Sequence, residues 1–348
     1  MSRPIRVLVV DDSAFVRKVV SQMLSRSPAI EVVGTARDGE DALELTEQLR
    51  PDVITLDLVM PRMNGVEFLR AQAARRPVPV VICSIAHETG AMALEAFEAG
   101  AVEFVQKPTA LATDRVYEIA EELIAKVEAA AKAIVARPPE PSVEPARTAT
   151  PPRRPGDPLR TDVVVLGIST GGPQALRYLI PRLPADFPVP VVVVLHMPVG
   201  YTAMYAERLN QISPLEVVEA RDGDVLRPGV VWVAPAGRHL TFARAADATV
   251  RAHLDLRPTD TPHRPAVDVL FQSAAAIFGP RVLGVVMTGM GSDGLLGAAH
   301  LKAQGGRVAT EAKSSCVVYG MPRAVDEAAL SDRSATLQEM ADAIAELI

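Results

Sequence analysis

Cysteine and aromatic residues are scarce in this sequence. Its 348 residues include only two cysteines, Cys83 and Cys316, which lie far apart and form no CxxC pair. A disulfide framework is therefore excluded, and a reducing compartment such as the cytoplasm is expected. We interpret both cysteines as ordinary structural thiols, because free cysteine is usually buried.

Positive charge and long apolar runs are also in short supply. The chain has 36 Lys and Arg residues against 42 Asp and Glu residues, so its formal net charge is −6. This balance lacks the basic footprint of a nucleic-acid-binding protein, so no nucleic-acid partner is expected. The apolar run at residues 7–10 meets Asp11 and Asp12 at once, unlike a signal peptide, and no apolar run is long enough to span a bilayer. We therefore expect no direct membrane insertion.

The chain length predicts about two domains, and the first is visible as a repeating pattern. Residues 1–110 alternate short β-branched runs with amphipathic segments of helix length. Because the apolar runs are continuous, they indicate a parallel sheet that is covered on both faces. This fivefold βα repeat predicts a doubly wound α/β domain. The expected strands are residues 5–10, 31–33, 53–56, 78–82 and 103–105, and the expected helices are residues 14–24, 40–49, 66–74 and 91–99.

A proline-rich segment separates this domain from a second one. A further helix is expected over residues 114–136, and residues 137–158 then carry eight prolines, a density that forbids regular helix or sheet. We interpret this segment as a semi-rigid, extended linker. The predicted boundaries are residues 1–125 for the first domain, 126–159 for the helical extension and linker, and 160–348 for the second domain.

The second domain also has an α/β pattern, which begins near residue 161. It predicts a second doubly wound parallel sheet. The C-terminal segment 337–348 carries a helical apolar stripe and is expected to pack on the core. The expected strands are residues 163–166, 189–195, 230–233 and 282–288, and the other expected helices are residues 174–179, 202–209, 267–276 and 294–302.

Acidic side chains follow two strands of the first domain. Asp11 and Asp12 come directly after the first strand, and Asp57 comes directly after the third. The carboxyl ends of parallel strands meet at one edge of the sheet, so these three carboxylates are expected to lie close together. Like charges at such short range repel unless a cation neutralises them. A hard divalent ion with oxygen ligands, Mg²⁺ above all, suits this site.

Two further polar residues belong to the same edge. Ser84 follows the fourth strand and Lys107 follows the fifth. Together with the three carboxylates they suit phosphoryl transfer onto a carboxylate, with Asp57 as nucleophile. Each aspartate taken alone is better explained as a helix N-cap. Capping does not account for the lysine and the hydroxyl at the same edge.

The segments VLVVDDSAFVRKVV, LDLVMPRMNG and EFVQKP, taken together, resemble a two-component receiver domain over residues 3–125. The resemblance implies a flavodoxin-like fold in which Asp57 accepts phosphate from a histidine kinase. It also implies that Mg²⁺ is bound by Asp12, Asp57 and the backbone carbonyl of Val59, with assistance from Asp11.

The same resemblance implies a conformational switch. Ser84 and Phe104 occupy the positions of the family's switch hydroxyl and switch aromatic, and Lys107 that of its lysine. Phe104 taken alone would more often be a core residue.

A serine in the second domain stands where a strand turns into a helix. The expected strand 163–166 runs into the segment GISTGGP, which contains Ser169. Such a turn exposes a serine above the sheet, and backbone N–H groups at the helix start can stabilise an oxyanion. The alternative is a nucleotide-binding turn. A dinucleotide-binding fold would place an acidic residue after the next strand, whereas His196 stands there, which favours acid–base chemistry.

Two more side chains complete a catalytic pattern. His196 and Asp293 each follow an expected strand, so they share an edge with Ser169. His196 would then act as general base, and Asp293 would orient it. Taken singly, the histidine would be structural and the aspartate a turn residue. The chain order Ser–His–Asp differs from that of the α/β-hydrolases, chymotrypsin and subtilisin, which indicates a distinct hydrolase family.

Six segments, GISTGGP, LHMP, APAGRHL, HRPAVDVLF, MTGMGSDG and YGMPRAV, carry a second resemblance. Residues 160–348 are similar to the catalytic domain of the chemotaxis protein-glutamate methylesterases, a Rossmann-like domain. The resemblance implies hydrolysis of glutamate γ-methyl esters, and often deamidation of glutamines, on the cytoplasmic helices of chemoreceptors. It also implies that the unphosphorylated receiver covers the esterase cleft.

The resemblance carries over residue by residue. It implies a triad of Ser169, His196 and Asp293, with the backbone N–H of Met290 serving the oxyanion. Thr170 and His263 would line the pocket, and the esterase would need no cofactor. Two alternatives are kept: a receiver joined to a non-enzymatic output, such as a DNA-binding module, and a cofactor-binding Rossmann domain.

Overall fold

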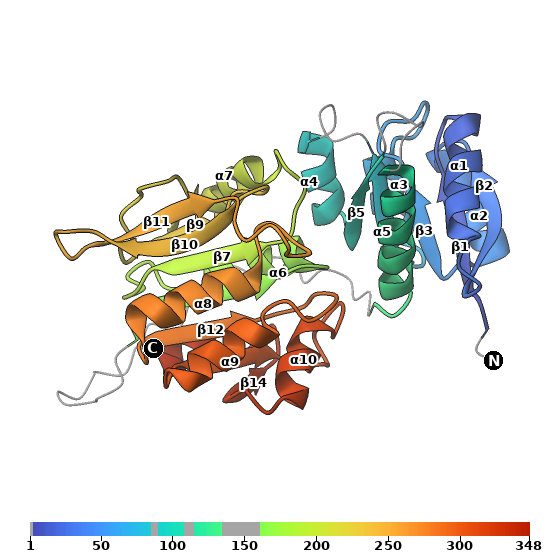
Figure 1. Cartoon of the computed structure of the whole chain (residues 1–348). Helices are drawn as coiled ribbons and strands as arrows, with labels where there is room; N and C mark the ends of the chain where they lie inside the picture. Colours follow the sequence, from blue (N-terminus) through green and yellow to red (C-terminus); the bar gives the residue numbers. More distant parts are fainter. Residues whose placement is uncertain (1–2, 85–89, 108–114, 134–160) are drawn as a thin grey trace. The chain divides into compact units, whose positions relative to one another are not determined.

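The computed structural model describes residues 3–84, 90–107, 115–133 and 161–348. The chain divides into two compact units, Met1–Pro138 and Pro139–Ile348 (Figure 1). The expected proline-rich linker at residues 137–158 lies outside the described residues. Among those described, no helix is both long enough and apolar enough to cross a membrane.

The first unit is built on a five-stranded parallel sheet with the order β2-β1-β3-β4-β5. This is the flavodoxin-like order, whose topological switch point lies between β1 and β3. The last four residues of β1 and all of β3 are buried, as expected from their continuous apolar runs. The strands are β1 (Ile5–Val10), β2 (Ile30–Ala36), β3 (Val53–Leu56), β4 (Val80–Ser84) and β5 (Glu103–Gln106), and the helices are α1 (Ala14–Leu24), α2 (Gly39–Leu49), α3 (Gly65–Ala73), α4 (Gly90–Glu98) and α5 (Arg115–Ala130).

Several helices of this unit begin at polar caps in the sequence. Asn64 caps α3 through a capping box with Glu67, and the Ser13 hydroxyl accepts the N–H of Val16 at the start of α1. The caps fix where each loop after a strand ends.

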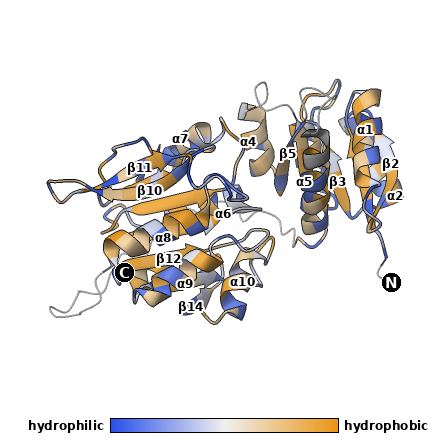
Figure 2. Ribbon diagram, in the orientation of Figure 1, coloured by the Kyte–Doolittle hydropathy of each residue, from blue (hydrophilic) through white to orange (hydrophobic). Residues whose placement is uncertain are grey.

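The second unit contains a seven-stranded parallel sheet with the order β14-β13-β12-β6-β7-β9-β8 and a separate antiparallel pair, β10-β11. Figure 2 shows its central strands as strongly hydrophobic. The strands are β6 (Val163–Ile168), β7 (Val191–Leu195), β8 (Glu216–Glu219), β9 (Val230–Val233), β10 (His239–Arg244), β11 (Val250–Asp255), β12 (Val282–Val286), β13 (Arg307–Glu311) and β14 (Arg333–Ala335). The helices are α6 (Gly172–Leu179), α7 (Thr202–Ile212), α8 (Val267–Phe278), α9 (Leu295–Ala303), α10 (Met321–Glu327) and α11 (Met340–Leu347), with a 3-10 turn at Ile180–Arg182.

The chain order places a switch point inside this sheet. From β6 the chain goes to β7 on one side, and later returns to β12 on the other side of β6. In an open parallel sheet, ligands bind outside the carboxyl ends of the strands at such a point. The ends of β6, β7 and β12 are therefore where a site is expected. The predicted fold class, two doubly wound α/β domains, is confirmed.

The elements differ from the expected ones mainly at their ends. The strand expected at residues 282–288 ends at Val286, and the helix expected at residues 114–136 ends at Ala130. The strands β8, β13 and β14, the β10-β11 pair and helix α10 were not expected. Both cysteines are buried, as anticipated, and burial raises the pKa of the Cys83 thiol to about 12.

Candidate functional sites

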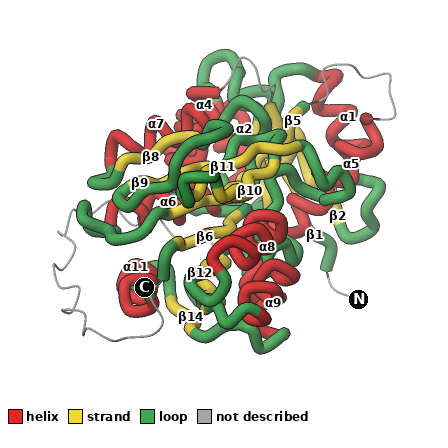
Figure 3. The backbone as a smooth tube through the Cα atoms, turned by 60° about the vertical axis from the view of Figure 1, so that its left-hand side comes forward, coloured by secondary structure: helices red, strands yellow, loops and turns green. Residues whose placement is uncertain are grey.

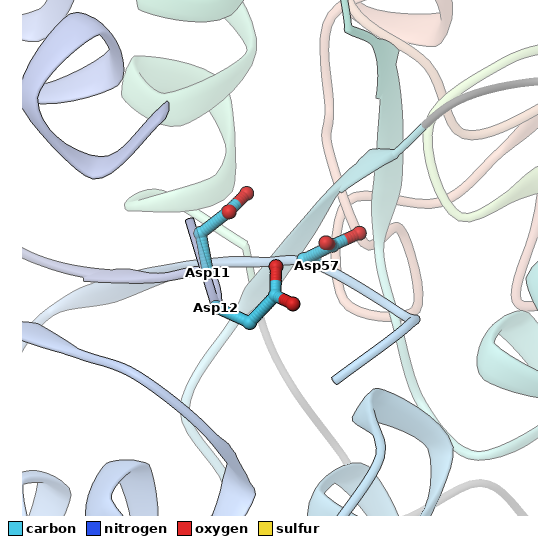
Figure 4. Close-up of side chains that lie close together, drawn as sticks. All are labelled: Asp11, Asp12 and Asp57. Atoms are coloured by element: carbon cyan, nitrogen blue, oxygen red, sulfur yellow. The ribbon is translucent and has the colours of Figure 1, made fainter. Parts of the chain in front are cut away.

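Three carboxylates gather at the switch point of the first unit, as the sequence predicts. Asp11 and Asp12 follow β1, and Asp57 follows β3 (Figure 4). One carboxylate oxygen from each residue lies within 4.8 Å of the others. Asp11 and Asp57 are buried, whereas Asp12 is exposed. The cluster is therefore shielded from solvent at Asp11 and Asp57 and open to solvent at Asp12.

Lys107 and Ser84 complete this cluster, hereafter the acidic cluster. The Lys107 ammonium contacts the Asp11 carboxylate and lies 2.7 Å from Oδ2 of Asp57. Burial alone would lower the pKa of Lys107, but the neighbouring carboxylates raise it above its ordinary value, so the lysine is charged. The Ser84 hydroxyl donates to Oδ1 of Asp57 at 3.1 Å.

The balance of charges in the acidic cluster suits a metal ion. Three carboxylates face one ammonium, which leaves an excess of negative charge in a partly buried place. Oxygen ligands of this kind are those that Mg²⁺ prefers. The residues present therefore fit the predicted Mg²⁺ site, and their role as ligands remains a prediction.

The two remaining residues predicted for this unit lie in different surroundings. Phe104, on β5, is buried with 2% of its surface exposed, so it packs as a core residue here. Val59, two residues after Asp57, is exposed. The predicted roles of Phe104 as a switch and of the Val59 carbonyl as a ligand remain predictions.

In the second unit, Ser169 stands in the turn between β6 and α6. Its backbone N–H donates to the carbonyl of Thr288 at 3.0 Å, which joins the end of β6 to the end of β12. Gly171 has a φ of 77°, and a Cβ added there would lie 2.6 Å from Cβ of Val317. Only glycine fits at position 171 without strain. Ser169 itself is half-buried at the sheet edge.

His196, after β7, is held by Asp293, which follows β12. The His196 Nε2 and Asp293 Oδ2 atoms are 2.9 Å apart. An ionised carboxylate only accepts hydrogen bonds, so Nε2 carries the proton and Nδ1 has the lone pair. Nδ1 is buried and has no hydrogen-bond partner among the described residues. It is therefore the nitrogen that can take up a proton.

Asp293 is kept ionised by donors on several sides. Burial alone would raise its pKa, but the hydrogen bond from His196 and the backbone N–H groups of Val267 and Asp268 outweigh burial, so the pKa lies below its ordinary value. The Val267 N–H donates to Oδ2 at 2.8 Å, and the Asp268 N–H donates to Oδ1 at 2.9 Å. A permanent negative charge thus faces the imidazole of His196.

The other predicted residues of this site lie around these three. The ring of His263 stacks on that of His196, with centroids 4.1 Å apart. Thr170 is buried, and its carbonyl accepts a hydrogen bond from the Thr288 hydroxyl at 2.9 Å. Met290 has 37% of its surface exposed, and its backbone N–H donates to no acceptor within the described ranges.

Three polar residues near this site were not predicted from the sequence: Glu311 and His239 are buried, and Asp268 is half-buried. Glu311 accepts the Thr288 N–H at 2.9 Å, and Asp268 accepts N–H groups from the start of α9. His239 accepts the Ala266 N–H on Nδ1 at 3.2 Å, and burial lowers its pKa. His239 and Asp268 stand in the segments APAGRHL and HRPAVDVLF, where only the resemblance marked them. For Glu311 no local sequence signal exists.

Comparisons with known proteins show the family of this chain. Residues 164–344 match the family model described as CheB methylesterase. The chain belongs to the CheB methylesterase family. Residues 7–117 match the model described as response regulator receiver domain. The prediction of a methylesterase family with an N-terminal receiver is therefore confirmed, and the two alternative outputs are not supported.

Curated relatives match over nearly their full length. The protein-glutamate methylesterase/protein-glutamine glutaminase 5 of Myxococcus xanthus is 54% identical over 338 residues, which cover 97% of this chain and 96% of the relative. A protein-glutamate methylesterase/protein-glutamine glutaminase of Symbiobacterium thermophilum is 46% identical over 99% of this chain. The crystal structure of the Thermotoga maritima CheB methylesterase catalytic domain, 42% identical, matches with a TM-score of 0.53 over 55% of this chain and 100% of that one.

Proposed function

We propose that this chain is a phosphorylation-activated serine esterase, which hydrolyses glutamate γ-methyl esters and deamidates glutamines on methyl-accepting chemoreceptors. The hydrogen bond between His196 and Asp293, at the sheet edge that bears Ser169, carries the proposal. The names of the relatives from Myxococcus xanthus and Symbiobacterium thermophilum support the choice of substrate. The partner would be the cytoplasmic helices of the receptors, which agrees with a cytoplasmic location.

In the first half of the proposed reaction, the Ser169 hydroxyl attacks the ester carbonyl. His196 accepts the hydroxyl proton on Nδ1, and Asp293 stabilises the resulting imidazolium. The Met290 backbone N–H would donate to the oxyanion, with Thr170 and His263 lining the pocket. The imidazolium then returns its proton to the leaving methoxide, and methanol departs from an acyl-enzyme on Ser169.

In the second half, water attacks the acyl-enzyme. His196 takes a proton from the water, and the glutamate carboxylate leaves as Ser169 regains its proton. With a glutamine substrate, ammonia replaces methanol as the leaving group and the product is again glutamate. Side chains and backbone groups of this chain serve each step, so we propose no cofactor for the esterase.

Replacing the nucleophile tests this proposal. Ser169→Ala should reduce methanol release from methylated receptors to the background rate, because no acyl-enzyme can form. Its thermal unfolding midpoint should stay close to that of the wild type, since Ser169 is half-buried. Ser213→Ala, which removes a hydroxyl at the end of α7, is the matched control and should keep full activity. Methanol release that survives in Ser169→Ala contradicts the proposed nucleophile.

We propose further that the acidic cluster accepts the regulatory phosphate. A chemotaxis histidine kinase would transfer a phosphoryl group from its histidine to the Asp57 carboxylate, forming an acyl phosphate. Asp11, Asp12, Asp57 and the Val59 carbonyl would hold Mg²⁺, which neutralises phosphate oxygens when bound. Lys107 supplies the fixed positive charge.

The regulatory step itself would be a change of charge at Asp57. The Ser84 hydroxyl, which donates to Asp57 in this structure, can turn to a phosphate oxygen instead, with Phe104 as its aromatic partner in the switch. We propose that the unphosphorylated receiver restrains the esterase and that phosphorylation relieves the restraint. The covalent link between the two units makes such control possible at any protein concentration.

A further inference from the structure

Helices α8 and α9 lie side by side (Figures 1 and 3). The first turn of each helix is capped by an aspartate that stands at or just before the start of the other helix. Asp293, in the loop before α9, accepts the N–H groups of Val267 and Asp268 in the first turn of α8. In return, Oδ1 of Asp268 accepts the N–H groups of Gly294 at 2.9 Å and Gly297 at 2.7 Å. We call this arrangement the crossed cap.

Neither helix has a cap of its own. The residues at the two N-cap positions, Ala266 and Gly294, make no side-chain cap hydrogen bond. The first N–H groups of a helix lack partners within the helix and favour negative charge. The two carboxylates of the crossed cap accept hydrogen bonds from these N–H groups and also supply the negative charge that a helix N-terminus favours. The helix starts and the aspartates therefore hold one another in place.

Close packing leaves this arrangement little freedom. A Cβ added to Gly297 would lie 3.1 Å from Cα of Asp268 and 2.5 Å from Cβ of Phe271. At Gly294, with a φ of 99°, it would lie 3.1 Å from Cγ1 of Val267. Because the backbones touch, a lost hydrogen bond at Asp268 cannot be replaced by a small shift of α9 toward α8.

The crossed cap determines how Asp293 meets His196. Oδ1 of Asp293 is engaged by the Asp268 N–H, and Oδ2 is shared between the Val267 N–H and His196 Nε2. Both oxygens are therefore fixed, and rotation of the carboxylate would break at least one bond. Asp268 in turn holds Gly294, the residue directly after Asp293.

We propose that Asp268 is a positioning residue for the esterase, which keeps the Asp293 carboxylate aimed at His196 by anchoring the loop before α9. The proposal rests on the proposed roles of His196 and Asp293. Asp268 touches neither of the reacting groups and acts only through Asp293. Its loss should therefore affect the chemical step and leave substrate binding intact.

The test compares variants of the full-length protein, treated with acetyl phosphate and Mg²⁺. Asp268→Ala should lower kcat for methanol release by about 10- to 100-fold, with KM within about two-fold, because a slightly misplaced catalytic group costs rate. Asp268→Asn retains an acceptor oxygen and should lose no more than about five-fold, since neutral hydrogen bonds are weaker but similarly directed. Asp332→Ala is the matched control. Asp332 accepts the Val308 N–H near the start of β13, at the opposite edge of the sheet, so kcat should be unchanged.

A double-mutant cycle separates positioning from a general loss of stability. If Asp268 acts through Asp293, then Asp268→Ala should cause less than a two-fold further loss of kcat in an Asp293→Ala background. A full additional loss in that background overturns the proposal, as does wild-type kcat in Asp268→Ala. Equal losses in Asp268→Ala and Asp332→Ala also overturn it.

A second measurement keeps this test independent of the receptor substrate. The rate at which a fluorophosphonate labels Ser169 depends on activation of the serine and not on receptor recognition. The same order of rates is expected, with Asp268→Asn above Asp268→Ala. If the wild type is labelled but releases no methanol, the proposed substrate is wrong, and the labelling rates alone decide the role of Asp268.

Discussion

Buried carboxylates occur in both units, and at the scale of single residues their surroundings differ. Asp57 has a charged partner in Lys107, and Asp293 has His196 and two backbone N–H groups. Glu311 is fully buried, and among the described residues its carboxylate accepts hydrogen bonds only from the Thr288 N–H and the Ser315 hydroxyl. Burial raises the pKa of Glu311, and these two hydrogen bonds offset that only in part. Glu311 therefore stays protonated up to a higher pH than an exposed glutamate would.

The pKa of Glu311 has a consequence for stability. A raised pKa in the folded state stabilises the fold below the ordinary value of 4.5, and this contribution is lost as the pH rises through the folded-state value. Glu311→Gln keeps a carbonyl oxygen for Thr288 and carries no charge at any pH. We expect its free energy of unfolding at pH 8 to exceed that of the wild type by about 1–3 kcal/mol, the size of a burial cost in mutational data. At pH 4 the difference should vanish.

Urea unfolding at the two pH values measures this effect. Glu339→Gln is the control, because hydrogen bonds from Thr336 lower the pKa of the exposed Glu339 and its charge is favourable. It should gain nothing at pH 8. A Glu311→Gln variant that is less stable than the wild type at pH 8 would show that the charged form is well accommodated.

At the scale of elements, the acidic cluster and the esterase triad are built from side chains at the carboxyl ends of strands. The turn after β6 is closely packed, since Gly171 has a positive φ and lies against Val317. An alanine there meets both the φ penalty and a clash, and the turn that it distorts carries Ser169. Positive φ alone costs about 1–2 kcal/mol per non-glycine residue.

We therefore expect Gly171→Ala to lower the free energy of unfolding by more than 2 kcal/mol, as roughly the sum of φ strain and overpacking. Esterase activity should fall by about 100-fold, because Ser169 is displaced. Gly223→Ala is a matched control, as Gly223 has a φ of 88° and nothing within 4 Å of an added Cβ. It should cost only the φ penalty and keep its activity. Equal losses in the two variants would show that the contact with Val317 is unimportant.

The strands that could be predicted from the sequence are those with continuous apolar runs. β1, β3, β6 and β9 were placed to within two residues, because burial on both faces leaves a run of valine and leucine. β8 and the β10-β11 pair escaped prediction, since charged residues such as Glu216, Arg244 and Arg251 interrupt their apolar pattern. Strand β14 is only three residues long.

For the sites, the sequence indicated which side chains stand at the ends of strands, and their catalytic roles stay predictions. Ser169, His196 and Asp293 lie at adjacent strand ends, and the structure joins two of them by a hydrogen bond. Asp268 and Glu311 could not be found in this way. Their importance depends on which backbone N–H groups face them, and that is settled by the packing of α8, α9 and β13 rather than by local sequence.

At the scale of the whole molecule, two sites of unlike chemistry stand on one chain. In the proposed function, the acidic cluster would bind a metal ion and accept a phosphoryl group, whereas the esterase site would act through Ser169, His196 and the ionised Asp293. Phosphorylation would replace the single charge of the Asp57 carboxylate by about two negative charges on the phosphoryl group, a net gain of about one. Control of one site by the other requires that the two states of the receiver differ in their effect on the esterase.

Asp57→Asn tests this control directly. Acetyl phosphate with Mg²⁺ should raise methanol release by the wild type by about 5- to 150-fold, the usual range of coupling between sites. The Asp57→Asn variant should keep the basal rate and show no increase, because the amide forms no acyl phosphate. Removing Mg²⁺ with a chelator should abolish the increase in the wild type as well.

Asp52→Asn is the matched control for this experiment, since Asp52 precedes β3 at the opposite end from Asp57 and bonds to the Arg6 N–H. It should respond to acetyl phosphate like the wild type. Deleting residues 1–158 distinguishes two forms of control. If the receiver restrains the esterase, the deletion raises the basal rate toward the activated one. If the deletion leaves the basal rate unchanged while acetyl phosphate still activates the full chain, the phosphorylated receiver must assist the esterase, and restraint by the unphosphorylated receiver is wrong.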